Sequence, residues 1–76
     1  MWSEERIRSV LETKEEALVN ARVQLKTAEA WVQSGLHMNA PEFVSVSYRD
    51  VQKYEQLVLR LEEQIKVLTA ILDIQK

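Results

Sequence analysis

The chain has 76 residues, with ten basic and twelve acidic side chains, one histidine, no cysteine and a net charge of −2. This length allows a single domain, residues 1–76, near the lower limit for a self-sufficient core, where small chains add disulfides, a metal or partner subunits. The absence of cysteine excludes disulfides and thiolate metal sites, and one histidine cannot build a zinc site alone. Association with other copies of the chain is therefore the expectation.

Charge and hydropathy exclude further classes. A net charge of −2 lacks the basic face of a nucleic-acid binder, so we do not expect nucleic acid as a direct ligand. The first residues have no apolar signal-peptide core, and no apolar run approaches the ~18 residues of a membrane span. We therefore expect a soluble protein that is neither secreted nor embedded in a membrane.

The only glycine, Gly35, and the only proline, Pro41, divide the chain into two long halves. Ser3 followed by two glutamates is typical of a helix N-cap, and Gly35 favours a left-handed helix end, which predicts a helix over residues 3–33. Its apolar residues alternate in steps of four and three, as in a seam that another helix covers: Ile7, Leu11, Leu18, Ala21, Leu25, Ala28 and Val32. Lys14 occupies one seam position, where it either extends its ammonium into water or sets the register.

The second half repeats the pattern with no polar interruption. Ser47, with Asp50 three residues later, resembles a capping box and predicts a helix over residues 48–75. Its seam is Val51, Tyr54, Val58, Leu61, Ile65, Leu68 and Leu72. Two helices of near-equal length, each with one apolar seam, predict a mostly all-α fold, an antiparallel two-helix hairpin.

The predicted connection, residues 34–47, is longer than the 2–8 residues typical between helices. Within it, Val44 and Val46 alternate with serines over residues 43–47, a pattern rich in β-branched residues and typical of a strand. Residues 36–38 are the nearest partner for such a strand. The pattern therefore leaves open a short strand or a small β-hairpin in the connection.

Polar residues show no arrangement for catalysis. Glu4–Glu5, Glu12–Glu16 and Glu62–Glu63 lie mostly off the seams among basic residues and are typical of solvated faces. His37 has no partner base or nucleophile at motif spacing, and no phosphate-binding loop, nucleophile elbow or zinc-protease motif occurs. We therefore predict a protein that is not an enzyme and has no catalytic, cofactor-binding or metal-binding residues.

Apolar residues left over from the seams point to an interface. Val67, Ile71 and Ile74 are spaced four and three apart and are predicted to lie opposite the second seam, as on a helix sandwiched between neighbours. Val19 and Val23 repeat this on the first helix but are equally typical of ordinary exposed aliphatics. Trp2 and Trp31 either anchor contacts or close the ends of the core. The predicted interface residues are therefore Trp2, Trp31, Val67, Ile71 and Ile74.

Residues 43–55, Phe-Val-Ser-Val-Ser-Tyr-Arg-Asp-Val-Gln-Lys-Tyr-Glu, continuing through Leu61 to Ile65, resemble the small head–tail joining proteins of tailed bacteriophages, typified by the lambda W protein. In that family a strand ends in Ser or Thr that caps a second helix. Here Ser47 matches the cap, and Val51 with Tyr54 matches the first apolar turn. The second helix is about ten residues longer than the family pattern, and the hairpin glycine and the basic C-terminal tail are absent.

The resemblance implies a structural phage protein, a head–tail connector subunit in a ring bound to a portal or to neighbouring connector subunits. It also implies a location in the virion or the bacterial host cytoplasm. The alternative is a small regulatory or inhibitory module that docks helices on a host protein. A weaker alternative is an enzyme subunit that contributes helices to a composite site.

Overall fold

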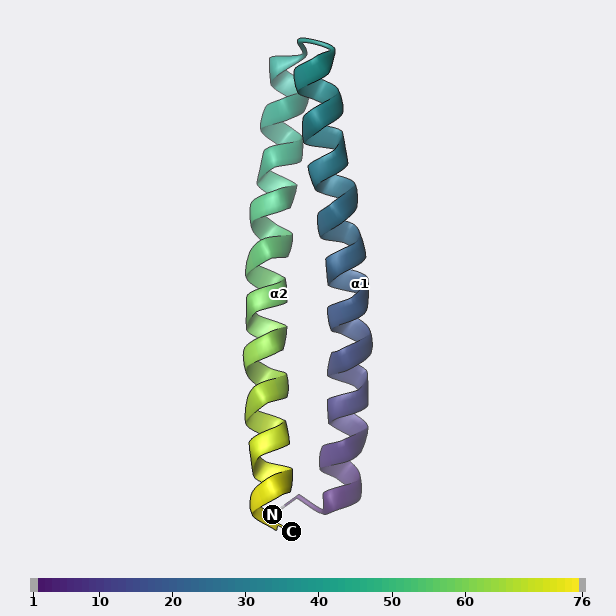
Figure 1. Ribbon diagram of the computed structural model, residues 1–76, viewed down its shortest axis with the longest axis vertical. Coiled ribbons are helices and arrows are strands. Elements are labelled where there is room, and N and C mark those ends of the chain that lie inside the picture. Colours follow the sequence, from purple (N-terminus) through teal and green to yellow (C-terminus); the bar gives the residue numbers. More distant parts are fainter. Residues whose placement is uncertain (1, 76) are drawn as a thin grey trace.

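The computed structural model describes residues 2–75 as two long antiparallel helices joined by a tight turn (Figure 1). Helix α1 runs over Glu4–His37 and helix α2 over Pro41–Gln75. The body measures 55 × 15 × 14 Å, and the start of α1 and the end of α2 lie at the same end of the hairpin (Figure 1). The predicted mostly all-α hairpin is confirmed, and residues 2–75 contain no strand.

The start of α1 follows the prediction. Ser3 is the N-cap in an extended conformation, and its hydroxyl accepts the Arg6 N–H at 3.2 Å. The Ser3 carbonyl accepts the Ile7 N–H at 3.0 Å. Glu4 and Glu5 occupy the first turn, where carboxylates offset the positive end of the helix dipole.

The turn is shorter than predicted and lies elsewhere. The helices continue through most of residues 34–47, so only Met38, Asn39 and Ala40 connect them. Asn39, not Gly35, adopts the left-handed conformation, with φ of 55°. The Asn39 N–H donates to the Leu36 carbonyl at 3.2 Å and the Ala40 N–H to the Gly35 carbonyl at 2.9 Å, which satisfies carbonyls at the end of α1. Pro41 opens α2, where its missing N–H costs nothing.

The short strand that the pattern left open over residues 43–47 does not form, because this segment forms the first turns of α2. Ser47 is likewise a buried residue inside α2 and not its cap. The physical reason is the seam itself. Val44 and Ser47 extend the steps of three and four that continue at Val51, so helical packing against α1 overrides the β-propensity of the valines.

The hydrophobic core is a single thin layer between the helices. Its centre is Leu18, Ala21, Val58 and Leu61, and none of the described side chains is completely buried. The accessible surface is 6091 Å², whereas a compact protein of this mass exposes about 4,800 Å². A hairpin of two helices therefore leaves much apolar surface uncovered.

Near the turn the two helices approach so closely that one position of α1 has no room for a side chain. Gly35 is buried on the α1 seam, and a Cβ there would lie 2.7 Å from Cγ2 of Val44 and 2.9 Å from Cδ1 of Phe43. Valine in a helix has one strongly preferred rotamer, so Val44 cannot turn aside at low cost. Glycine is needed here for close packing and not for backbone conformation.

We expect Gly35→Ala to lower stability. Alanine gains about 1 kcal/mol of helix propensity, but overpacking a tight contact costs typically 1–3 kcal/mol. The net loss of about 1 kcal/mol corresponds to a Tm roughly 4–8 °C lower in a domain of this size. Thermal unfolding followed by circular dichroism measures it, with Ser34→Ala on the exposed neighbouring position as the control. A higher Tm for Gly35→Ala would show that the helices separate there at little cost.

Candidate binding surfaces

The two sides of the hairpin that flank the seam differ in character. We define the charged flank as residues 5, 8, 12, 15, 19, 22, 26, 29, 33 and 36 of α1 with 45, 48, 52, 55, 59, 62, 66, 69 and 73 of α2. The apolar flank, on the other side, is residues 6, 10, 13, 17, 20, 24, 27, 31, 34 and 38 with 43, 46, 50, 53, 57, 60, 64, 67, 71 and 74. These sets follow from the steps of four and three that locate the buried seam.

The charged flank carries eleven acidic and basic residues, whereas the apolar flank carries four. Arg22 and Glu62 approach within 3.9 Å across the charged flank, with both side chains about half exposed. An exposed pair at this separation contributes little to stability. The main effect of these charges is to keep this side of the hairpin solvated.

Among residues 2–74, whose burial the structure describes, thirteen large apolar side chains are exposed, and seven of them lie on the apolar flank: Trp31, Met38, Phe43, Val46, Val67, Ile71 and Ile74. Trp31 and Phe43 contact each other edge to face across the two helices, with ring centroids 5.6 Å apart. Both rings nevertheless remain exposed. They form a ridge, which we call the aromatic ridge.

At the opposite end of the same flank the surface is hollowed. A groove of about 470 Å³ is lined by Trp2, Val10, Lys14, Arg60, Glu63, Gln64, Val67 and Leu68. We call this hollow the terminal groove. Trp2, one of its lining residues, also makes a cation–π contact with Arg6, whose guanidinium lies 5.0 Å from the centre of the ring. Lys14 is half-buried on the seam, in agreement with a packed stem.

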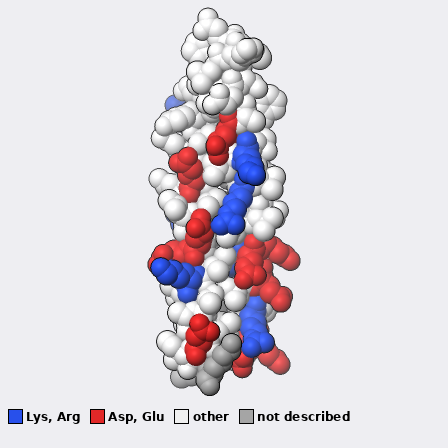
Figure 2. Space-filling view, in the orientation of Figure 1, with Lys and Arg blue, Asp and Glu red and all other residues white. Residues whose placement is uncertain are grey.

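A second surface surrounds the turn. Residues 30–48, which we call the tip, contain one charged residue, Glu42, and Figure 2 shows this end without charge on the visible face. Six of the thirteen exposed apolar side chains lie here, including Leu36 and Tyr48 on the charged-flank side. These two residues line a hollow of about 330 Å³ with Val44 and Pro41.

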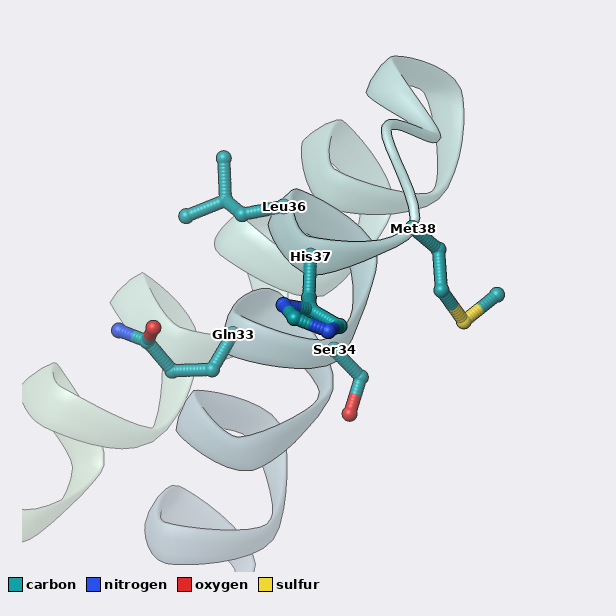
Figure 3. Close-up of a pocket in the computed structure, with 5 residues that line it drawn as sticks. All are labelled: Gln33, Ser34, Leu36, His37 and Met38. Carbon is teal, nitrogen blue, oxygen red and sulfur yellow. The ribbon is translucent and has the colours of Figure 1, made fainter.

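A wider hollow beside the end of α1 is lined by Gln33, Ser34, Leu36, His37 and Met38. Figure 3 shows these side chains pointing in different directions, with Gln33 and Met38 on opposite sides of the helix. Catalysis needs polar groups that converge on one point, and the groups drawn here diverge. His37 is an exposed residue in the last turn of α1.

The predicted interface residues all lie on the surface of the hairpin. Trp2 and Val67 line the terminal groove, and Trp31, Ile71 and Ile74 lie on the apolar flank. The expected position of Val67, Ile71 and Ile74 opposite the seam is corrected, because they lie beside it. Val19 and Val23 are exposed away from the apolar flank.

Sequence reasoning missed the surface residues of the tip, namely Leu36, Met38, Phe43, Val46 and Tyr48. The sequence pattern places residues 43–47 in the connection, with a strand left open, so it does not reveal the helical face that they build with α1. The available signal was the near absence of charge from residue 30 to residue 48, a depletion typical of interface centres.

The acidic clusters remain dispersed in the fold. Glu12, Glu15 and Glu16 are exposed on α1, as are Glu62 and Glu63 on α2. Within residues 2–75, no group of three or more histidine or acidic side chains is placed to hold a metal ion. Neither helix, over its described residues, has an apolar stretch long enough to cross a membrane.

The geometry defines a class of structure, an elongated helical hairpin with uncovered apolar surfaces on one flank and around its turn. Comparison with protein-family models found no match. Comparisons with curated proteins and with solved structures also found no match. The apolar flank and the tip are therefore the features of this chain that bear on its function.

We expect Ile71→Lys combined with Ile74→Lys to lower the mass of the assembled protein while leaving helicity largely unchanged. Ile71 is 37% and Ile74 83% exposed, so charges there cost the hairpin little but must be desolvated at an interface. Circular dichroism and light scattering on the same sample measure both properties. Unfolding of the variant as a monomer would instead place these residues in the core of the hairpin.

Proposed function

We propose that this protein is a non-enzymatic structural protein that holds other protein chains through helix-mediated contacts, as a subunit of a phage virion assembly. The observation that carries the proposal is the tip, where six large apolar side chains are exposed around a segment whose only charged residue is Glu42. An exposed apolar surface of this kind is typical of a protein–protein contact.

The pairing of the helices limits how such contacts form. The seams of α1 and α2 cover each other along the hairpin, from Ile7 near one end to Gly35 near the turn. A module that docks one free amphipathic helix in the groove of a host protein would have to open this hairpin. Contacts made by the exterior of an intact hairpin need no such opening, and they favour an assembly subunit over the inhibitory module.

The virion setting, with a portal or neighbouring connector subunits as partners, is supported by the sequence resemblance alone. The helical pattern at Val51, Tyr54, Val58 and Leu61 supports that resemblance. The strand and the helix cap of the family pattern do not support it, because residues 43–47, Ser47 included, lie inside α2. Deleting the gene from the genome that carries it should yield particles with unjoined heads and tails. Intact infectious particles would contradict the virion setting.

We expect Leu36→Glu combined with Tyr48→Glu to abolish partner binding and rescue of that deletion while leaving helicity unchanged. The two residues are 60% and 53% exposed, and losing their burial removes about 3 kcal/mol, roughly a hundredfold in affinity. The matched control is Val19→Glu combined with Leu59→Glu, two aliphatics at 60% and 66% exposure on the charged flank. Equal loss in both variants would show that the tip has no special role.

A further inference from the structure

The apolar flank is incompletely buried in a way that a second helical layer would complete. Ala17 and Leu57 pack against the central core cluster from this side yet remain half-buried, and Val10 is half-buried in the terminal groove. The flank of a body 55 Å long and 15 Å wide covers about 800 Å², the area each partner contributes to a standard-size interface.

The ridge and the groove of this flank are placed symmetrically. Val10, which lines the groove, is the seventh residue of α1, and Trp31 of the aromatic ridge is the seventh from its other end. A second copy turned end for end therefore brings its Trp31 over the Val10 of the first, and the reverse holds by symmetry. Trp31 of each aromatic ridge then lies over the terminal groove of the other copy.

The charges at the rim follow the same symmetry. Lys53 is the thirteenth residue of α2, and Glu63, which lines the groove, is the thirteenth from its other end. The end-for-end arrangement sets Lys53 of each copy opposite Glu63 of the other. Opposite charges at a rim fix orientation and register.

We propose that two copies of this chain pack apolar flank against apolar flank, end for end, as a closed four-helix bundle. This inference rests on the proposed function and names the first partner as the chain itself. A two-fold contact uses the same patch on both copies and leaves no ridge or groove free for further growth. The bundle leaves Leu36 and Tyr48 uncovered at each end, on the charged-flank side of the tip, for a different chain.

The mass in solution tests the association. Analytical ultracentrifugation of the full chain is expected to give twice the chain mass. Trp31→Glu should raise the dissociation constant by at least about thirtyfold, the effect of losing an interface hot spot, with helicity retained. Leu59→Glu, on the charged flank, should leave the dimer intact. A monomer at all concentrations, or equal effects of both variants, would overturn the proposal.

The rim charges test the orientation. Lys53→Glu alone and Glu63→Lys alone should each weaken the dimer, because each sets like charges opposite one another. The double variant should restore the dimer to nearly its original affinity. Additive weakening in the double variant would overturn the end-for-end arrangement.

Cross-linking gives an independent reading of the same geometry. The chain contains no cysteine, so Asn20→Cys supplies the only thiol, and Asn20 is the seventeenth of the 34 residues of α1. On the apolar flank at the middle of α1, the thiols of two end-for-end copies meet, and a short bis-maleimide should link them. Val19→Cys, adjacent in sequence but on the charged flank, should not cross-link. If Val19→Cys cross-linked and Asn20→Cys did not, the contact would lie on the charged flank and the proposal would be overturned.

These tests separate this inference from the proposed function. A monomer that still rescues the gene deletion through Leu36 and Tyr48 would overturn the end-for-end dimer and leave the assembly role intact. A dimer whose deletion has no effect on particles would support the inference about self-association and contradict the virion setting.

Discussion

The close approach of α1 and α2 along one seam is the constraint on which the rest of the structure depends. Half of the α1 seam is a line of residues seven apart, and those nearer the turn are small: Ala21, Ala28 and Gly35. Opposite this line, Val44 already fills the space that a Gly35 side chain would need, and Val58 packs in the same cluster as Ala21. Small residues on one helix let the branched side chains of the other reach its backbone. The hairpin is therefore narrow along its length.

That narrowness determines what remains exposed. A helix that is apolar over more than one stripe needs more than one neighbour, and a hairpin offers each helix only one. Among the residues that the structure describes, thirteen large apolar side chains are consequently at the surface, mainly on the apolar flank and around the tip. A chain this small commonly needs stabilisation beyond its own core, and the absence of cysteine removes disulfides as a source of it. Covering the exposed apolar surfaces with another chain would supply such stabilisation.

The sequence predicted the parts of the fold that long-range periodicity determines. The two helices and their seams followed from the steps of three and four, the Ser3 cap from the two glutamates after it, and the antiparallel hairpin from the near-equal lengths of the helices. The turn is misplaced in the sequence prediction because Gly35 was interpreted as a helix end, whereas the Val44 and Phe43 side chains of α2 occupy the space that a side chain at residue 35 would need. The residue that does take the left-handed conformation, Asn39, tolerates it through its short polar side chain, which is a weaker signal than glycine.

Reliance on a local sequence pattern also hid part of the candidate binding surface. Val44 and Val46 alternate with serines and favour a strand when they are considered alone, but Val44 also stands seven residues before Val51 on the seam. The heptad extends over all of α2, so its packing free energy outweighs a preference confined to five residues. The surfaces beside the seam near the turn can be identified only once residues 43–47 are known to be helical. The exposed Phe43 and Val46 were for that reason not predictable from the pattern used.

Charge segregation explains why uncovered apolar surface need not produce indiscriminate association. Bringing a neighbour against the charged flank would remove eleven acidic and basic residues from water, and an unpaired charge pays a large desolvation cost on burial. Arg22 and Glu62 approach each other only to 3.9 Å across the helices and stay about half exposed, so a second chain that covered them would remove both charges from water. The charged flank is therefore a poor site for a neighbouring chain, and the apolar flank and the tip are the better ones. In the proposed two-fold pair, a ridge and a groove at mirrored positions would occupy each other, so contact through the apolar flank would end at two copies and any further growth would have to proceed through the tip.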